Sequence, residues 1–577
     1  MSSIRRVLPF SASTTPVQAL TYLLGISLFS ISFLVFLNSS ISFVVTDLIG
    51  QKHAVGDVVG TLGFADELVA LLACPAWGLV SDRLGVRWVA VLGYAILACA
   101  LGLLVQARNV YPQLLLARIL FAVGGSATAT MVTAILPTLT NDSEHEPAAA
   151  PETTTATTTT ILSRSTTSRS PASGPRPVSS GGKPSVLAGY VGLFTGCGAL
   201  LALSLFLPLP ARFSEIDGVT PGQAVEYSFY VVGAAALVVA VLVAWGLRDI
   251  KSERGKGWRL LLGLKPKRSA DASANDDDDD DDCDARDASA ASKKVIPYLH
   301  LVKASVRLGF TDSRIALGYL GGFVARASTV AISLFIPLFV NTFFIRNGFC
   351  QGAPNDPSPD LKRECREAYV LSSVLTGVAQ LMGLLCAPLF GHSASRLAPG
   401  RVNWPVVVAA VFGILGYLAL PRLPSPEISN VDARGGSPLI LLAVSLVGIS
   451  QIGSIVCSLG SLGRGILAVD AGPAPSPAPP AAARRGLARS PGAAAPVESQ
   501  PLISSRAHKD TSRVCLKGSI SGVYSLCGGA AILILTKVGG LLFDKWSNGV
   551  PFYMMALFNA VLLVATLVVD SSHAWAA

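Results

Sequence analysis

Long apolar runs recur along the chain, and each can form an α-helix that crosses the roughly 30 Å of hydrocarbon in a bilayer. Only 14% of the 577 residues are charged, whereas soluble proteins have about 25%, so most of the chain is expected to lie in lipid. Because a segment in lipid must satisfy its own backbone hydrogen bonds, we predict an all-α membrane protein with twelve transmembrane helices. The predicted spans are 21–47, 58–80, 88–105, 114–136, 186–209, 227–247, 315–344, 368–390, 404–420, 439–462, 520–543 and 550–569.

The predicted spans form two groups of six, which divide the chain into two halves. Residues 21–247 make the N-terminal half and residues 315–569 the C-terminal half. Residues 248–314 are a linker between them, and residues 1–20 and 570–577 are the two termini. Basic residues gather in the loops that follow even-numbered spans, which places these loops and both termini in the cytoplasm. The net charge of +9 therefore reflects topology, and no nucleic-acid partner is expected.

Three of the predicted cytoplasmic loops have low-complexity sequences. Loop 141–184 is rich in Thr, Ser and Pro, loop 464–516 is rich in Ala and Pro, and the linker contains seven consecutive aspartates at 276–282. None has enough apolar residues for a core, so we predict disorder. After the aspartates, apolar residues near one helical face predict an interfacial helix that leads into the seventh span. They are Ile296, Leu299, Val302, Val306 and Phe310.

The loop between the second and third spans, GLVSDRLGVRW, combines glycines, an acid and two arginines. The pattern Gly78, Asp82, Arg83, Gly85, Arg87 resembles the signature loop of the major facilitator superfamily. The resemblance implies two related six-helix halves with substrate held between them near the midplane. We expect Asp82 to accept hydrogen bonds from helix N-terminal amides at a cytoplasmic gate, and the arginines to engage the neighbouring span. The alternative is a basic loop that serves topology alone.

A degenerate copy of this loop follows the eighth span, which supports an internal repeat. In GHSASRLAPGRVNW, Gly391, Arg396 and Arg401 correspond to Gly78, Arg83 and Arg87, whereas Ser395 stands where the acid would be. The flanking stretches FADELVALLACPAWG and ARNVYPQLLLARILFAVGGSATATMVTAILP resemble a fungal, multidrug-resistance-like branch of the same superfamily.

Only two acids, Asp66 and Glu67, lie well inside a predicted span. Burial favours the protonated form of a carboxyl, so these residues are the candidates for proton coupling. Arg118 lies at a similar depth in the fourth span and is a suitable ion-pair partner. Its segment LLLARILFAVGG resembles the family's fourth-helix motif, which implies a role in proton transfer, although Ala122 replaces the first glycine of that motif. A static bridge within the N-terminal half is the alternative.

Polar residues on spans one, four, seven and ten are candidates for a substrate cavity, because the resemblance implies that these spans line it. Arg326 lies close to the midplane, where it can attract an anionic or polar substrate group; alternatively it pairs with a helix C-terminus or reaches towards the interface. The other candidates are Asn38, Thr128, Thr329 and Gln451. Each of these is equally explained as a contact between helices. Lys537, in the eleventh span, is expected to reach the outer interface.

No catalytic motif, metal-ligand spacing or cofactor signature occurs in the sequence, so neither an enzyme nor an ATP-driven pump is predicted. Cys350 and Cys365 fall in an outer loop, where an oxidising compartment favours a disulfide. The segment from Glu498 to Ile503 reads ESQPLI, which has the spacing of an acidic dileucine sorting signal for an adaptor. This motif favours the vacuolar membrane over the plasma membrane.

The predicted function is secondary transport of small organic compounds by alternating access, with proton-coupled export as the direction. Export rests on the glycine-rich fifth span, which resembles the superfamily's antiporter motif, although Cys197 stands where that motif has a proline. Two alternatives remain: an uptake facilitator for a nutrient or metabolite, and a receptor or scaffold that does not transport.

Overall fold

The computed structural model describes residues 9–11, 13–51, 55–141, 182–250, 253, 256–261, 298–347, 366–397, 402–429, 435–467 and 516–576. Several features predicted from the sequence lie wholly or mostly outside the described residues. They are the three low-complexity segments, Ile296, Arg401, the cysteines Cys350 and Cys365, and the sorting motif at 498–503.

Twelve helical stretches in the described part of the chain are long and apolar enough to cross a membrane, one for each predicted span. No strand occurs among the described residues. The predicted all-α fold with twelve spans is confirmed. The stretches are Pro16–Leu48, Val58–Leu84, Val86–Leu104, Val110–Thr140, Lys183–Ser214, Gly222–Gly246, Ser313–Arg346, Val370–Ser395, Trp404–Arg422, Leu439–Leu467, Lys517–Lys545 and Val550–Ser572.

Several spans consist of more than one helical element, because short π-helical turns interrupt them. The N-terminal half contains α2 (Pro16–Leu20), η1 (Thr21–Ser27), α3 (Leu28–Phe43), η2 (Val44–Leu48), α4 (Val55–Leu84), α5 (Val86–Leu104), η3 (Val110–Leu114), α6 (Leu115–Thr140), α7 (Lys183–Leu201), η5 (Ala202–Phe206), α8 (Leu209–Ser214) and α9 (Pro221–Gly246). The linker and the C-terminal half contain α10 (Trp258–Leu261), α11 (Tyr298–Thr311), α12 (Ser313–Val330), η7 (Ala331–Phe335), α13 (Ile336–Arg346), α15 (Arg366–Ser395), α16 (Trp404–Ala419), η8 (Leu420–Arg422), α17 (Leu439–Leu467), α18 (Lys517–Ile534), η10 (Leu535–Gly539), α19 (Gly540–Lys545) and α20 (Val550–Ala576).

Local sequence sets the starts of several helices. Thr15 with Gln18, and Thr220 with Gln223, form capping boxes in which side chain and backbone satisfy each other reciprocally. In both cases a proline follows the capping threonine, at the first helical position where its missing N–H costs nothing. The Asp312 side chain accepts from two backbone amides at the start of α12.

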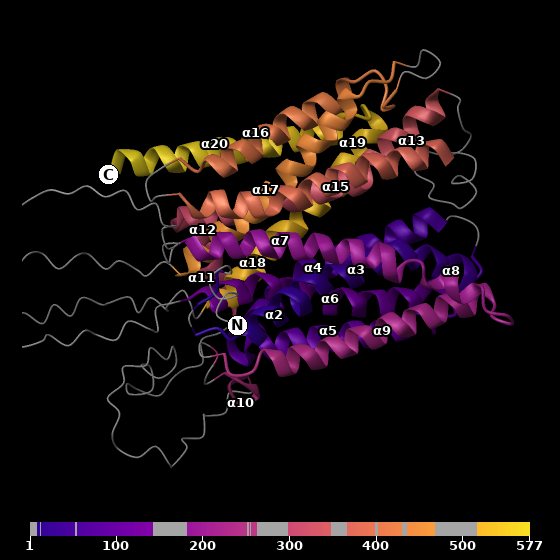
Figure 1. The fold of residues 1–577 in the computed structure, drawn as a ribbon, viewed down its shortest axis with the longest axis horizontal. Helices are drawn as coiled ribbons and strands as arrows, with labels where there is room; N and C mark the ends of the chain where they lie inside the picture. The colour runs from indigo at the N-terminus through magenta and orange to yellow at the C-terminus, as the bar shows by residue number, and fades with distance from the viewer. Residues whose placement is uncertain are drawn as a thin grey trace, which may run out of the picture.

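The two halves pack as separate bundles, and their largest contacts are between α4 and α18 and between α7 and α15 (Figure 1). The helix α7 also packs on α17, and α6 packs on α18. Both chain ends lie at the same end of the molecule. We call this end, which the sequence predicts to be cytoplasmic, the inner end, and the opposite one the outer end. The linker helix α11 packs on α12, α18 and α4, so the predicted helix before the seventh span is present.

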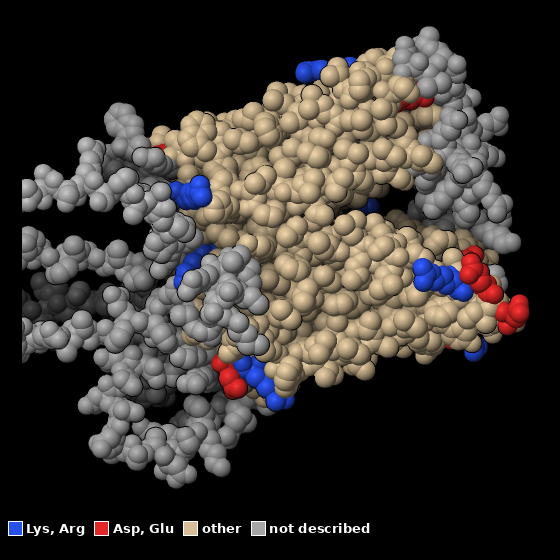
Figure 2. All heavy atoms as spheres, in the orientation of Figure 1, with Lys and Arg blue, Asp and Glu red and all other residues tan. Residues whose placement is uncertain are grey.

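A cleft separates the two halves towards the outer end and narrows towards the inner end (Figure 2). The described surface around it consists mostly of uncharged residues, as expected for helices in lipid. Among the described residues, the two halves are therefore in contact towards the inner end and separated by the cleft towards the outer end.

Candidate functional site

A buried ion pair joins α4 to α6 inside the N-terminal half. The Nε atom of Arg118 donates to Asp66 Oδ2 at 2.6 Å, and an Nη atom of Arg118 donates to Asn38 Oδ1, also at 2.6 Å. The Arg118 side chain is 4% exposed and the Asp66 side chain 20%. The predicted pairing of Asp66 with Arg118 is confirmed, and Asn38 of α3 is its third member.

This pair has hydrogen-bonding capacity that the protein does not use. Asp66 Oδ1 and Arg118 Nη1 have no hydrogen-bond partner among the described residues. Removing one member of a buried pair is costly, about 3–5 kcal/mol, because the other charge stays behind uncompensated. A protonation change at Asp66 therefore has a large effect on how strongly α4 and α6 hold together.

Glu67 is influenced by a charge of the opposite half of the molecule. It follows Asp66 directly, so its side chain is turned by about 100° around α4. Its strongest electrostatic partner is Arg326 of α12, ahead of Asp66 and Arg118. Among the described residues, no hydrogen bond or ion pair joins Glu67 or Arg326 to another group. Two adjacent acids on one helix thus interact with two different halves.

Arg326 lies beside a polar pair in the C-terminal half. Gln451 Nε2 of α17 donates to Thr329 Oγ1 at 3.0 Å, and Thr329 lies one helical turn after Arg326 on α12. Gly528 of α18 packs against the Arg326 side chain, since a Cβ atom there would lie 2.6 Å from Arg326 Cγ. Three of the predicted cavity residues, Arg326, Thr329 and Gln451, therefore form one group.

Thr128 does not line the cleft in this structure. It is fully buried between α5 and α6, with its methyl group against Gly93. The exposed Lys537 has its Nζ atom 3.9 Å from the centroid of the Phe64 ring of α4. Because α4 belongs to the other half, this cation–π contact crosses between the halves.

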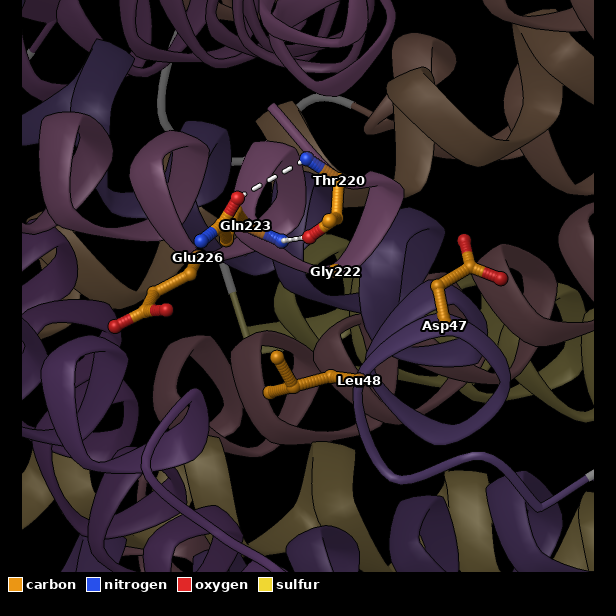
Figure 3. Close-up of a pocket in the computed structure, with 6 residues that line it drawn as sticks. All are labelled: Asp47, Leu48, Thr220, Gly222, Gln223 and Glu226. Atoms are coloured by element: carbon orange, nitrogen blue, oxygen red, sulfur yellow. Dashed lines mark hydrogen bonds between the residues drawn. The ribbon is translucent and has the colours of Figure 1, made fainter. Parts of the chain in front are cut away.

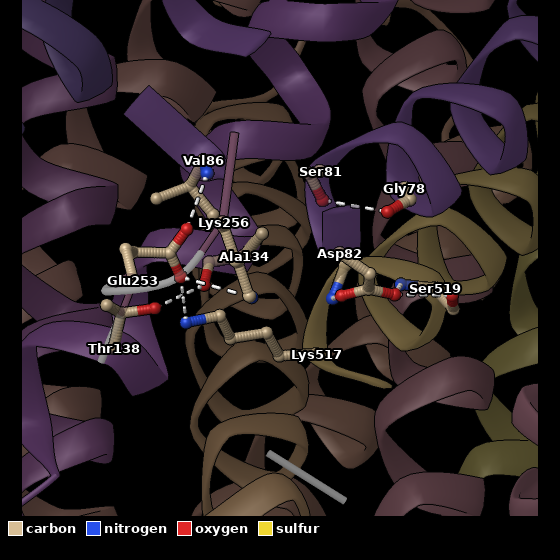
Figure 4. A network of polar contacts seen from close by, with 11 residues as sticks. Gly78, Ser81, Asp82, Val86, Ala134, Thr138, Glu253, Lys256, Lys517 and Ser519 are labelled. Carbon is tan, nitrogen blue, oxygen red and sulfur yellow. Dashed lines mark hydrogen bonds and ion pairs between the residues drawn. The ribbon is translucent and has the colours of Figure 1, made fainter. Parts of the chain in front are cut away.

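At the inner end, Asp82 caps the N-terminus of α18 (Figure 4). One carboxylate oxygen accepts from Gly518 N at 2.7 Å, and the other accepts from Ser519 N at 2.7 Å and from Ser519 Oγ at 2.5 Å. The predicted hydrogen bonding of Asp82 to helix N-terminal amides is confirmed. The amides belong to the C-terminal half, so Asp82 links the two halves.

Glycines allow α4 and α18 to approach closely at this point. A Cβ atom on Gly78 would collide with the carbonyl oxygen of Gly518 and lie 3.1 Å from Gly522 Cα. Gly85 has a φ of 96°, in the left-handed region that favours glycine, which turns the chain between α4 and α5. Of these two glycines of the signature loop, Gly78 is needed for close helix packing and Gly85 for the turn of the chain.

The two arginines of the loop differ in their contacts. The Arg83 carbonyl accepts from Gly257 N of the linker at 3.1 Å. The Arg87 guanidinium lies 5.0 Å from the ring centroid of Trp88, its neighbour in α5. Asp249, just after α9, is also among the charges that act on Arg87.

A cavity of about 480 Å³ lies at the outer end, away from these charges (Figure 3). Two of its polar side chains, Thr220 and Gln223, already cap α9. Asp47 and Glu226 lie at span ends, as the sequence predicts, whereas Asp66 and Arg118 lie within their spans. We therefore place the site at the central charges. No group of His, Cys, Asp or Glu in the described residues is placed to hold a metal ion.

The α18 residues that form the other side of the inner closure are not among the site residues predicted from the sequence. Asp82 accepts from Gly518 and Ser519, and Gly78 packs against Gly518 and Gly522. These three α18 residues lie in the segment KGSISG, residues 517–522, whereas the predicted span begins at residue 520. The small residues of this segment at four-residue spacing, Gly518 and Gly522, are the signal that indicates close helix packing.

Residues 28–150 match the family model described as Major Facilitator Superfamily. A search of curated protein sequences finds no match. Among solved structures, the chain is similar to the proton:xylose symporter XylE bound to 6-bromo-6-deoxy-D-glucose, with a TM-score of 0.52 and 10% sequence identity over 95% of this chain and 94% of that one. It also matches the E. coli fucose:proton symporter FucP, with a TM-score of 0.48 and 13% identity over 94% of this chain and 97% of that one.

At these identities the structural likeness shows the fold. The match over 28–150 includes the signature loop and both α4 and α6, whose charges form the central pair. The chain is thus an integral multi-pass membrane protein with the fold of the major facilitator superfamily, and part of its N-terminal half carries that family's sequence pattern.

Proposed function

We propose that the protein is a proton-coupled secondary transporter of small organic compounds that works by alternating access. The observation that supports this most is the charge arrangement at the cleft, where neighbouring acids interact with different partners. Asp66 binds Arg118 within its own half, while Glu67 interacts across the cleft with Arg326. A carboxyl that changes protonation at this position alters the attraction between the halves.

The cleft also has the features of a binding site for a polar or anionic compound. Arg326 is partly exposed and unpaired among the described residues, and Thr329 and Gln451 lie beside it. An arginine deep in a membrane needs a partner, and a substrate carboxylate or hydroxyl group supplies one. In this proposal a bound substrate and Glu67 compete for Arg326.

The proposed direction is export, as in multidrug-resistance-like antiporters of fungi, from a vacuolar or plasma membrane. The glycines of α7 that resemble an antiporter motif also have packing roles: Gly189 lies against Gly391, and Gly198 against Leu28. Direction therefore rests on the sequence resemblance. The proposed Cys350–Cys365 disulfide and the adaptor signal at 498–503 belong to the same proposal.

Reconstituted vesicles with an imposed pH gradient test the function. A panel of organic anions, drugs and metabolites is offered, and substrate and proton fluxes are followed together. Counterflow of substrate and protons supports export, whereas movement in the same direction indicates an uptake symporter. Absence of any flux across the panel, with protein shown to be folded, favours a receptor or scaffold.

A double variant tests the coupling site. Asp66→Asn and Glu67→Gln together are expected to abolish proton-driven transport, because neither remaining side chain can carry a proton at neutral pH. The matched control is Glu226→Gln, an acid at the outer end that accepts a hydrogen bond from the Tyr230 hydroxyl at 3.0 Å. Unchanged pH dependence in the double variant would eliminate the carboxylate mechanism.

A further inference from the structure

Glu253, which follows α9 in the linker, lies at the inner end and contacts both halves. Glu253 Oε2 accepts from the backbone N–H of Val86, the first residue of α5, at 2.9 Å. Glu253 Oε1 forms an ion pair with Nζ of Lys517, the first residue of α18. Figure 4 shows this carboxylate between the two helix starts. Val86 belongs to the N-terminal half and Lys517 to the C-terminal half, so one side chain bridges them.

Other contacts hold the linker to the N-terminal half. Gly257 N donates to the Arg83 carbonyl at 3.1 Å, and the Trp258 and Trp88 ring centroids lie 6.5 Å apart. Lys256 Nζ lies 3.4 Å from Glu253 Oε1, within the linker itself. Glu253 is thus anchored to the signature loop and α5, and its contact with Lys517 is the one that crosses.

Lys517 depends on Glu253 while the inner end is closed. Its side chain is 1% exposed, and it lies at a helix N-terminus, where the helix dipole disfavours a cation. Asp82 is occupied by the amides of Gly518 and Ser519. A buried lysine without its partner is unfavourable, whereas the same lysine in water is not.

Glu253 is ionised in this position. Burial raises the pKa of its carboxyl, but Lys256, Lys517 and the hydrogen bonds from Lys517 and Val86 N–H outweigh burial and hold the pKa at about 2. Glu253 therefore brings a negative charge to this contact at neutral pH.

We propose that Glu253 and Lys517 are positioning residues for alternating access, and that their contact forms only when the inner end is closed. Glu253 stays on the N-terminal half through Val86 and releases Lys517 when α18 moves away. The opened inner end then hydrates the lysine. This inference rests on the alternating-access function proposed above, and it adds residues outside the signature loop that set the population of the inner-closed form.

Distances between spin labels test this inference without any substrate. Labels on Trp245→Cys of α9 and Trp404→Cys of α16, both exposed, report the separation of the two halves near the inner end. The native cysteines are replaced in this background. Glu253→Gln and Lys517→Gln are each expected to raise the population with the longer distance by about fivefold or more, the scale of a typical coupling between two states. Glu226→Gln is the matched control and should change nothing.

Two further variants guard against a simple folding defect. Lys517→Arg keeps the charge and should retain most of the short-distance population, whereas Lys517→Met keeps only the apolar stem and should behave like the glutamine variant. Unchanged distances in both Glu253→Gln and Lys517→Gln would overturn the inference. A shift in distances without transport of any compound would leave this contact standing and remove the proposed transport function.

Discussion

The two places where the halves meet are built on the same packing but held by different forces. At α4 and α18, Gly78 lies against Gly518; at α15 and α7, Gly391 lies against Gly189, with a Cβ on Gly391 only 2.8 Å from Gly189 Cα. At the first crossing Asp82 accepts from amides of the other half. At the second, the hydroxyl of Ser395 donates to the His392 carbonyl of its own helix at 2.7 Å.

A second repeated contact shows the same difference between the two halves. In each half, an acid at or after the last helix accepts a hydrogen bond at the start of an earlier helix. In the C-terminal half, Asp570 Oδ2 accepts from Asn403 N, just before α16, at 2.8 Å. This matches Glu253, which follows the last helix of its half and accepts from the start of α5. Of these two acids, Glu253 also binds a lysine of the opposite half, whereas Asp570 forms no such ion pair with the described residues. The contact between the acid and a helix start is common to both halves. The ion pair of Glu253 with Lys517 occurs at the crossing of α4 with α18 and connects the halves there.

The largest effect is expected from glycine substitution at the charged crossing. Gly78→Ala places a Cβ against the Gly518 carbonyl and prevents inner closure. Overpacking of this kind costs about 1–3 kcal/mol, which corresponds to a fall of about 5- to 150-fold in the inner-closed population. The label pair on α9 and α16 measures it. Gly63→Ala, on the same helix with no atom within 4 Å of its Cβ, is the control; equal effects of the two would refute the packing argument.

Removing the cap compares the two crossings directly. Asp82→Ala leaves two α18 amides and the Ser519 hydroxyl without their acceptor, a loss of about 1–3 kcal/mol in favour of the closed form. Ser395→Ala removes a bond within one helix and should stay within about 0.5 kcal/mol. Both values come from label distances and from thermal unfolding. Similar losses at both positions would show that the crossings are equivalent after all.

A smaller effect is expected from adding the missing acid. Gly391 already contacts the Ser185 carbonyl near the start of α7, and Ser395 lies one turn further along α15. The Ser185 hydroxyl has no hydrogen-bond partner among the described residues. Ser395→Asp should therefore cap α7, stabilise inner closure by about 0.5–2 kcal/mol, and slow transport. The new cap should increase the population with the short distance between the labels. A larger population with the long distance would rule out the new cap.

The smallest expected effect is that of pH on the Glu253 contact. Its pKa is held at about 2, below the ordinary 4.5, mainly by Lys256 and Lys517 against the effect of burial. A group with a lowered pKa contributes fully above its ordinary pKa and loses that contribution as the pH falls towards the lowered value. Between about pH 6 and pH 8 the difference between wild type and Glu253→Gln should therefore stay constant. A difference that changes in this range would assign the contact a role in proton sensing.

The sequence predicts the fold well because its strongest signals are local. Apolar runs of sufficient length give the twelve spans, and all twelve are present. The signature loop gives the position of Asp82 and its hydrogen bonding to a helix start. Asp66 and Arg118 are paired, because matching depth in two neighbouring spans restricts the partners of a buried charge.

Partners across the two halves could not be found in this way. Glu253 is one acid in a charged linker, and Lys517 stands at the end of an Ala- and Pro-rich loop, 264 positions further along the chain. Thr128 shares its spans' polar pattern with Thr329, yet one packs against Gly93 and the other faces Gln451. Which way a side chain points depends on the rotation of each helix within the bundle.

The sequence by itself determined that this protein is a twelve-helix membrane protein with two related halves and a few charges inside the membrane, because hydrophobic length and charge act on each segment separately. Only the tertiary structure decided that Arg118 pairs with Asp66 and not with the adjacent Glu67, that Asp82 caps α18, and that Glu253 reaches Lys517. These contacts depend on how helices far apart in the chain cross, and hydropathy carries no information on that.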